Sequence, residues 1–115
     1  MEALVCKALG DPTQDPNKSG SALVLEKKHP IPGLNSPTAV RVKLKATSLN
    51  YATYLQLQGL YQEKLPLPFV PGSDYSGIVD AVGTAVSQFK LGDRVCSFAG
   101  FGSFAQFIVA DETEL

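Results

Sequence analysis

The sequence contains few nitrogen and sulfur ligands for zinc: one histidine, His29, and two cysteines, Cys6 and Cys96, far apart in the chain. A catalytic zinc ion takes three protein ligands from Cys, His, Asp or Glu, so we predict no metal site. His29 precedes a proline in a loop-like stretch, and we expect its side chain to be exposed to solvent. The cysteines form no Cys-x-x-Cys pair, which favours reduced thiols in a cytosolic chain. Cys96 lies in a predicted strand, and we expect it to be buried.

The sequence also lacks the features of three other classes of protein. A Ser-His-Asp hydrolase would need the single histidine as its base and a Gly-x-Ser-x-Gly turn, which is absent. The net charge is -1, with basic and acidic residues interspersed, so the chain offers no surface for nucleic acid. The longest uncharged run, Val95 to Ala110, is shorter than the about 18 residues of a membrane span, and Met1-Glu2-Ala3 carries no basic leader. We therefore predict a cytoplasmic protein without nucleic-acid or membrane partners.

What the sequence does contain is enough apolar surface for one folded domain. Its 115 residues are 44% hydrophobic and 18% charged, which is typical of a globular chain of this size. Val40, Val42, Leu44 and Ala46 alternate with charged or polar residues, which predicts a strand with one apolar face. Shorter β signals occur at residues 3–8, 22–28, 77–82, 94–98 and 105–110. These strands and the turn residues between them indicate a mainly β fold, with the strands closing into a barrel.

Only Tyr51 to Gln58 predicts a helix. Asn50 or Ser48 would cap its first amides, and Gly59 would end it in a left-handed conformation. The prolines between residues 66 and 71 predict an extended connector after it, because proline cannot continue a helix and donates no amide hydrogen bond.

Two other segments predict irregular structure. Residues 11–21 are rich in Pro, Asn, Gly and Ser, which predicts an exposed loop. Residues 100–105 match the letters Gly-x-Gly-x-x-Ala of a dinucleotide-binding fingerprint, but that fingerprint requires a helix directly after it. A strand-like run follows here instead, so we predict a hairpin turn.

Four segments share their residues and their spacing with one known family. They are Ser-Leu-Asn-Tyr through Gly-Leu-Tyr at 48–61, Pro-Gly-Ser-Asp-Tyr-Ser-Gly-Ile-Val with Val-Gly at 71–83, Gly-Asp-Arg-Val at 92–95, and Gly-Ser-Phe-Ala-Gln-Phe at 102–107. Across residues 38–115 the chain resembles the quinone oxidoreductase, or zeta-crystallin-like, branch of the medium-chain dehydrogenase/reductase superfamily. The resemblance implies a GroES-like, partly open β barrel with a short helix. It also implies that residues 1–115 form an incomplete N-terminal catalytic domain, and that the Rossmann nucleotide-binding domain is absent from this chain.

The resemblance implies chemistry without zinc. In zinc-containing relatives a Cys, a His and a Glu ligate or flank the metal, and the matching positions here are Asn50, Ser73 and Asp74. An amide and a hydroxyl do not supply what thiolate and imidazole supply to zinc. The implied reaction is hydride transfer from NADPH, bound mainly by the absent domain, to a small-molecule quinone or α,β-unsaturated carbonyl.

The same resemblance indicates five site residues. Asn50 and Tyr61 match positions that face the nicotinamide and the substrate, so they are the candidate catalytic residues. Tyr54, Ser73 and Asp74 are candidates for lining the cleft. Each has a structural alternative: Asn50 could only cap the helix, Tyr61 could be a packed aromatic, and Asp74 could only stabilise a turn.

A second interpretation is a non-enzymatic interaction module, because the same barrel also serves as a co-chaperonin subunit. A co-chaperonin would need a long mobile apolar loop and ring-forming edge strands, whereas the matched segments follow the reductases. A regulatory product that acts on a full-length partner is a third interpretation. If the chain is a reductase domain, we expect it to be inactive alone, and a homodimer is one option for the full-length form.

Overall fold

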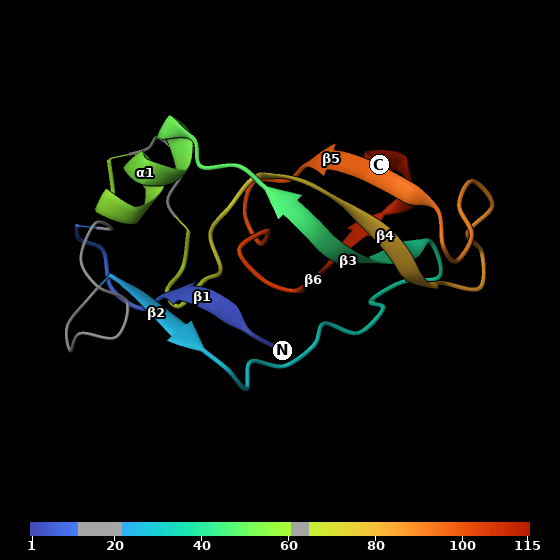
Figure 1. Ribbon diagram of the computed structural model, residues 1–115, viewed down its shortest axis with the longest axis horizontal. Helices are drawn as coiled ribbons and strands as arrows, with labels where there is room; N and C mark the ends of the chain where they lie inside the picture. Colours follow the sequence, from blue (N-terminus) through green and yellow to red (C-terminus); the bar gives the residue numbers. More distant parts are fainter. Residues whose placement is uncertain (12–21, 61–64) are drawn as a thin grey trace.

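The computed structural model describes residues 1–11, 22–60 and 65–115, so the predicted loop at residues 11–21 falls almost wholly outside the described chain. The described chain is mainly β structure with one α-helix (Figure 1). The helix is α1 (Tyr51–Gln58), and a short 3-10 helix (Glu112–Glu114) follows the last strand. The described strands are β1 (Ala3–Cys6), β2 (Leu23–Glu26), β3 (Ala39–Thr47), β4 (Asp74–Val82), β5 (Arg94–Phe98) and β6 (Phe107–Asp111).

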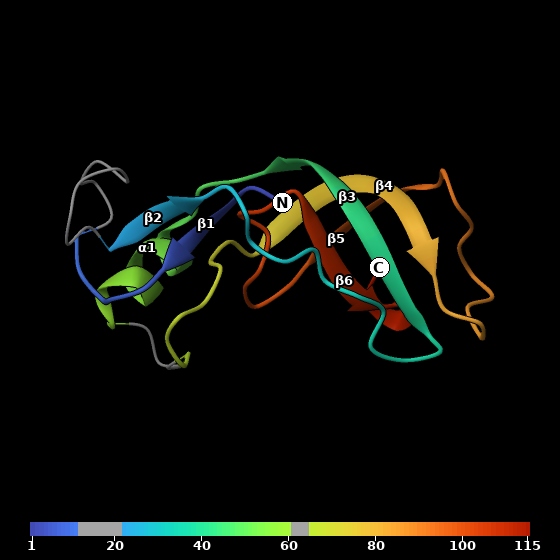
Figure 2. The same ribbon diagram turned by 90° about the horizontal axis from the view of Figure 1, so that it is seen from below.

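The strands form two antiparallel sheets, one with the order β5-β4-β3-β6 and one made of β1 and β2. Both views place the β1–β2 pair and α1 at one end of the molecule and the larger sheet at the other (Figures 1 and 2). The two ends are joined where the Leu4 amide donates to the carbonyl of Phe104 at 2.9 Å and the Gln106 amide donates to that of Glu2 at 3.2 Å. The arrangement confirms the partly open β barrel with a short helix.

The alternating pattern of β3 predicts its buried face correctly over the first half of the strand. Val40 and Val42 are fully buried, and the charged residues between and after them are not. The pairing with β4 then shifts between Leu44 and Ala46, which leaves Lys45 as an extra residue in β3. A bulge moves the side chains that follow it to the opposite face of the strand. Ala46 is therefore exposed, although the alternating pattern predicts it on the apolar face.

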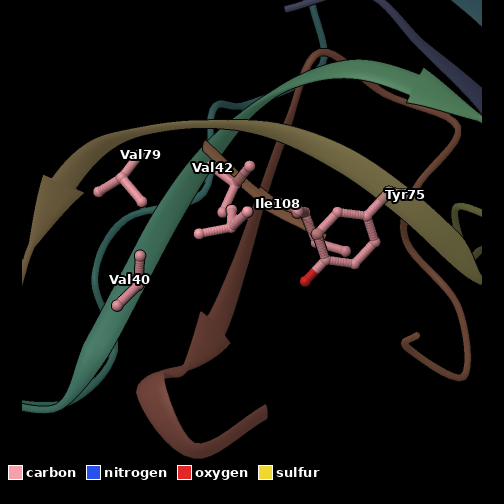
Figure 3. Close-up of a cluster of buried hydrophobic side chains, with 6 residues drawn as sticks. Val40, Val42, Tyr75, Val79 and Ile108 are labelled. Carbon is pink, nitrogen blue, oxygen red and sulfur yellow. The ribbon is translucent and has the colours of Figure 1, made fainter. Parts of the chain in front are cut away.

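The main core lies on one face of the larger sheet. The cluster draws its side chains from β3, β4, β5 and β6. Figure 3 shows Val42, Ile108 and Tyr75 pointing toward one another. Burial of an aliphatic side chain of this kind contributes about 1.5–3 kcal/mol to folding. The cluster therefore holds β3 against β4. This packing also fixes the position of the end of β3 relative to the start of β4. The members of the cluster are Val40, Val42, Tyr75, Val79, Val95 and Ile108.

A second, smaller core holds α1 against the β1–β2 pair. Leu57 of the helix packs with Cys6, Leu23 and Phe69. The helix has the predicted bounds, and Gly59 ends it with a φ of 75°, the left-handed conformation expected of a helix-ending glycine. The proline-rich passage is a non-helical connector as predicted, but it bends at residues 67–68 instead of running extended. Phe69 exchanges two backbone hydrogen bonds with Cys6, at 2.7 and 3.1 Å.

Other strand predictions are confirmed with small changes of bounds. β5 has the predicted bounds, while β4 begins three residues earlier than predicted, at Asp74, and β6 begins at Phe107. The Gly-x-Gly-x-x-Ala segment leads into β6 and not into a helix, as predicted. The predicted hairpin turn is wrong, because β5 and β6 lie at opposite edges of the larger sheet and do not pair. Within the described ranges, the single α-helix has only eight residues, and no helix has the length and apolar character needed to cross a membrane.

Two side-chain predictions are wrong. Cys96 is exposed, because β5 turns Val95 toward the core and the next residue faces outward. The side chain of His29 is only 29% exposed, and its Nδ1 atom lies 3.3 Å from a carboxylate oxygen of Glu26. The ring lies beside the Glu26 carboxylate, and the backbone of His29 exchanges two hydrogen bonds with Met1, contacts that the loop-like sequence does not indicate. Both cysteines are free, with Cys6 buried.

Candidate functional site

Polar side chains from three parts of the chain meet where β3 ends and β4 begins. These strands are antiparallel, and Thr47 at the end of β3 pairs with Tyr75 near the start of β4. The loop into α1 therefore lies beside the residues that precede β4. This geometry brings Ser48 and Asn50 next to Ser73 and Asp74, which are more than twenty residues away in sequence.

Asn50 is the centre of this cluster. Its side-chain oxygen accepts a hydrogen bond from the Thr53 amide at 2.9 Å, so Asn50, and not Ser48, caps α1. Its side-chain nitrogen donates to Ser73 Oγ at 2.6 Å and to Asp74 Oδ1 at 3.3 Å. Asn50 thus caps the helix and also joins the helix start to two other predicted site residues.

Ser73 and Asp74 differ in exposure and in charge. Ser73 is 4% exposed, whereas Asp74 is half-buried. The Ser48 hydroxyl lowers the pKa of Asp74 below the ordinary aspartate value of 3.8, and the Asn50 amide adds to this effect against the opposing effect of desolvation. Asp74 is therefore ionised at neutral pH, and it orients the Asn50 amide as a fixed acceptor.

A further pair of hydroxyls supports the cluster and was not predicted from the sequence. Thr47 Oγ1 donates to the backbone carbonyl of Asp74 at 2.7 Å, and it lies 2.7 Å from Ser103 Oγ. Because the Thr47 proton goes to the carbonyl, Ser103 is the donor in the second bond. Ser103 is 1% exposed, so this pair ties the Gly102-Ser103 loop to the start of β4 from inside. The only sequence signal was the position of Ser103 in a matched segment.

The predicted tyrosines lie partly outside this geometry. Tyr54 is 39% exposed and stacks on Tyr51, with ring centroids 6.2 Å apart and an interplanar angle of 15°. Both rings project from α1, the helix that Asn50 caps. Tyr61 lies outside the described residues. A depression of about 480 Å³ lies beside Asp74, and its lining includes Ser48, Ser76 and Cys96.

The donor set of the cluster suits hydrogen bonding to an oxygen atom better than metal binding. Asn50 and Ser73 offer an amide and a hydroxyl, and they are bonded to each other. Among residues 1–11, 22–60 and 65–115, no three His, Cys, Asp or Glu side chains form a group that could hold a metal ion. The described residues also lack a glycine-rich turn that opens a helix, so they do not suit the pyrophosphate of a dinucleotide.

The partly open barrel with a polar cluster at the junction of β3, α1 and β4 defines a GroES-like domain of the kind found in oxidoreductases. A family model described as the alcohol dehydrogenase GroES-like domain matches residues 36–115. The chain belongs to this family, within the medium-chain dehydrogenase/reductase superfamily, as the four sequence segments predict.

Known relatives share this domain over most of the chain. The quinone oxidoreductase-like protein 2 of Bos taurus is 42% identical over 93 residues, which are 81% of this chain and 26% of that protein. The human synaptic vesicle membrane protein VAT-1 homolog-like structure covers 99% of the chain with a TM-score of 0.85 and 27% identity. The quinone oxidoreductase of Thermus thermophilus, solved alone and with NADPH, covers 100% with a TM-score of 0.76 and 26% identity.

The chain corresponds to only part of each relative. It spans about a quarter of the length of the bovine protein, 34% of the human chain and 31% of the Thermus chain.

Proposed function

We propose that this chain forms the acceptor-side wall of an active site in which a hydride passes from NADPH to a quinone or an α,β-unsaturated carbonyl, without zinc. The observation that carries the proposal is the cluster in which Asn50 holds Ser73 and Asp74. By the resemblance, these residues match positions that ligate or flank the metal in zinc-containing relatives, and here they are an amide and a hydroxyl beside one carboxylate. The name of the bovine relative and the NADPH complex of the Thermus enzyme support the class of reaction.

The proposed division of labour follows from what the described residues offer. NADPH, when bound, supplies the hydride, and a nucleotide-binding domain beyond the matched segment would hold its phosphates. This chain would orient the acceptor and exclude water from its carbonyl group. We propose a cytoplasmic enzyme, and a homodimer as the full-length form.

Four of the five predicted site residues have a role in this proposal. Asn50 fixes the geometry of the cluster, and Asp74 keeps the Asn50 amide in one orientation. Tyr54 and Tyr61 would contact the ring or chain of the acceptor, since aromatic rings offer a flat apolar surface with a polar end. The stacking of Tyr54 on Tyr51 presents such a surface on α1.

The test is a hybrid protein that joins this chain to the part of the bovine relative outside the matched segment. NADPH oxidation is measured with 9,10-phenanthrenequinone and with trans-2-nonenal, for the hybrid and for the 115-residue chain alone. We expect turnover by the hybrid only, and about a 100-fold loss of kcat/KM on Asn50→Ala, because displacement of the cluster misplaces the acceptor.

Asn35→Ala is the matched control, since Asn35 is exposed and lies in another loop. It should leave the rate unchanged. A folded hybrid that binds NADPH and reduces neither acceptor would contradict the proposal and favour the interaction module.

A further inference from the structure

We propose that the Ser73 hydroxyl donates the hydrogen bond to the carbonyl oxygen of the acceptor, and that Asn50 is a positioning residue that acts through Ser73. This assignment rests on the proposed function. It names the group of this chain that touches the substrate, and it moves the direct contact from Asn50 to its neighbour.

The orientation of the Asn50 amide is fixed by two partners that each have one hydrogen-bonding role. The Thr53 backbone N–H only donates, so the Asn50 atom 2.9 Å from it is the oxygen. The Asp74 carboxylate only accepts, so the Asn50 atom 3.3 Å from it is the nitrogen. That same nitrogen lies 2.6 Å from Ser73 Oγ. Ser73 is therefore the acceptor in this bond.

The proton of Ser73 is consequently unused. Within the described part of the chain, the only hydrogen bond of the Ser73 side chain is the one that it accepts from Asn50. Ser73 is 4% exposed, and a buried donor without an acceptor is unfavourable, so such groups call for an explanation. A ligand oxygen would complete the pair. Asn50, in contrast, directs its amide hydrogens at Ser73 and Asp74 and keeps none for a ligand.

A donor fixed in this way suits the chemistry of the acceptor. When the electron-poor carbon gains a hydride with both electrons from the reduced nicotinamide, a π electron pair moves onto the carbonyl oxygen. A preorganised donor stabilises the charge that develops there. The proton that completes the reduced product comes from bulk solvent as the product leaves the site, and Ser73 keeps its own. The ionised Asp74 does not contact the acceptor in this arrangement. It accepts a hydrogen bond from the Asn50 amide, and that amide in turn donates to Ser73.

The test measures the carbonyl directly in the full 115-residue chain. The probe is cyclohex-2-enone labelled with ¹³C at the carbonyl carbon, and the readouts are its infrared C=O band and its dissociation constant. The variants are Ser73→Ala, which removes the donor, and Ser73→Thr, which keeps it. Ser36→Ala is the control, an exposed serine in another loop. Ser73→Cys, with a weak donor of similar shape, serves if the alanine variant does not fold.

We expect the band to move to lower wavenumber on binding to the native chain, to Ser73→Thr and to Ser36→Ala. In Ser73→Ala or Ser73→Cys the band should stay at its free position, and binding should weaken about fivefold. An amide NMR spectrum that is unchanged outside the site shows that the variant is folded.

An unchanged band shift in folded Ser73→Ala overturns the assignment and leaves the proposed function standing. A native chain that gives no shifted band overturns it as well. Failure of the proposed function has a separate sign, which is a hybrid that binds NADPH and reduces neither acceptor.

Discussion

The hydroxyl oxygen of Ser48 lies 2.6 and 2.7 Å from the two carboxylate oxygens of Asp74. The single proton of Ser48 is thus committed to Asp74, which explains why Ser48 does not cap the neighbouring helix. The contact also keeps Asp74 ionised, so the cluster carries one fixed negative charge at neutral pH. Asp74 is suited to hold an amide and not to deliver a proton.

Ser48→Ala should raise the pKa of Asp74 toward 3.8, because it removes the strongest cause of the depression. A carboxyl group whose pKa is lowered by folding stabilises the native state above its ordinary value and loses that contribution as pH falls through the folded value. The stability difference between native protein and variant should be present at neutral pH and vanish well below pH 3.8.

A ¹³C NMR titration of the Asp74 carboxyl carbon measures its pKa in the native protein and in the variant. Urea unfolding at neutral pH and well below pH 3.8 measures the stability difference between them. Ser76→Ala is the control and should leave the pKa unchanged. The explanation fails if Asp74 titrates identically in native protein and in Ser48→Ala.

Gly77→Ala should destabilise the protein by about 3 kcal/mol. A Cβ atom at this position would lie 2.3 Å from the carbonyl oxygen of Lys43 and 2.7 Å from Val42 Cγ1, so the β3–β4 pairing must open to admit it. Gly100→Ala is the matched control, because a Cβ there has no atom within 4 Å. Equal urea midpoints for the two variants would show that β3 and β4 are not packed as described.

Glu112 is a buried carboxylate with a structural role. One of its oxygens accepts from the backbone amides of Ser87 and Gln88, both at 3.2 Å. Glu112→Ala leaves both amides without this acceptor and should lower the free energy of unfolding by about 2 kcal/mol. Glu112→Gln keeps a carbonyl oxygen and should lose less, and the exposed Glu114→Ala should be neutral. Equal losses for Glu112→Ala and Glu114→Ala in urea unfolding would contradict this role.

The two cysteines should react at very different rates with a thiol reagent such as DTNB. Cys96 is exposed, whereas Cys6 is fully buried and burial raises the pKa of its thiol above the ordinary 9.0. We expect one thiol to react promptly in the native chain and the other only on unfolding. Cys96→Ser identifies the fast thiol. If a fast thiol remains in that variant, the β1–β2 pair does not bury Cys6.

Local signals explain which elements the sequence predicts well. The helix begins and ends at residues whose side chains decide its ends, Asn50 as cap and Gly59 as the left-handed terminus. The alternating pattern predicts the buried face of β3 correctly as far as the bulge at Lys45. The bulge itself depends on pairing with β4, so the sequence of β3 alone does not indicate it. The orientation of β5 is not readable from its own letters, because Val95 and Cys96 are both apolar and only the pairing of Cys96 with Ser76 assigns the outer face.

The candidate site likewise has one part that the sequence predicts and one part that only folding determines. The resemblance selects Asn50, Ser73 and Asp74, and the structure brings them into one hydrogen-bonded cluster. The donor and acceptor roles within the cluster depend on atoms that meet only after folding. The spacing of these residues in the sequence does not indicate those roles. The support from Ser103 to Thr47 spans 56 positions of sequence, so no local pattern could indicate it.

The bonds between Glu2 and Gln106 join the first strand region to the last, across 104 positions of sequence. On the ribosome, the β1 region leaves the exit tunnel long before its partner is made. Until then it presents an open strand edge, which other chains can pair with. The β1 edge therefore stays open until residue 106 has emerged, however far synthesis then continues, and this delay is the interval in which another chain can pair with it.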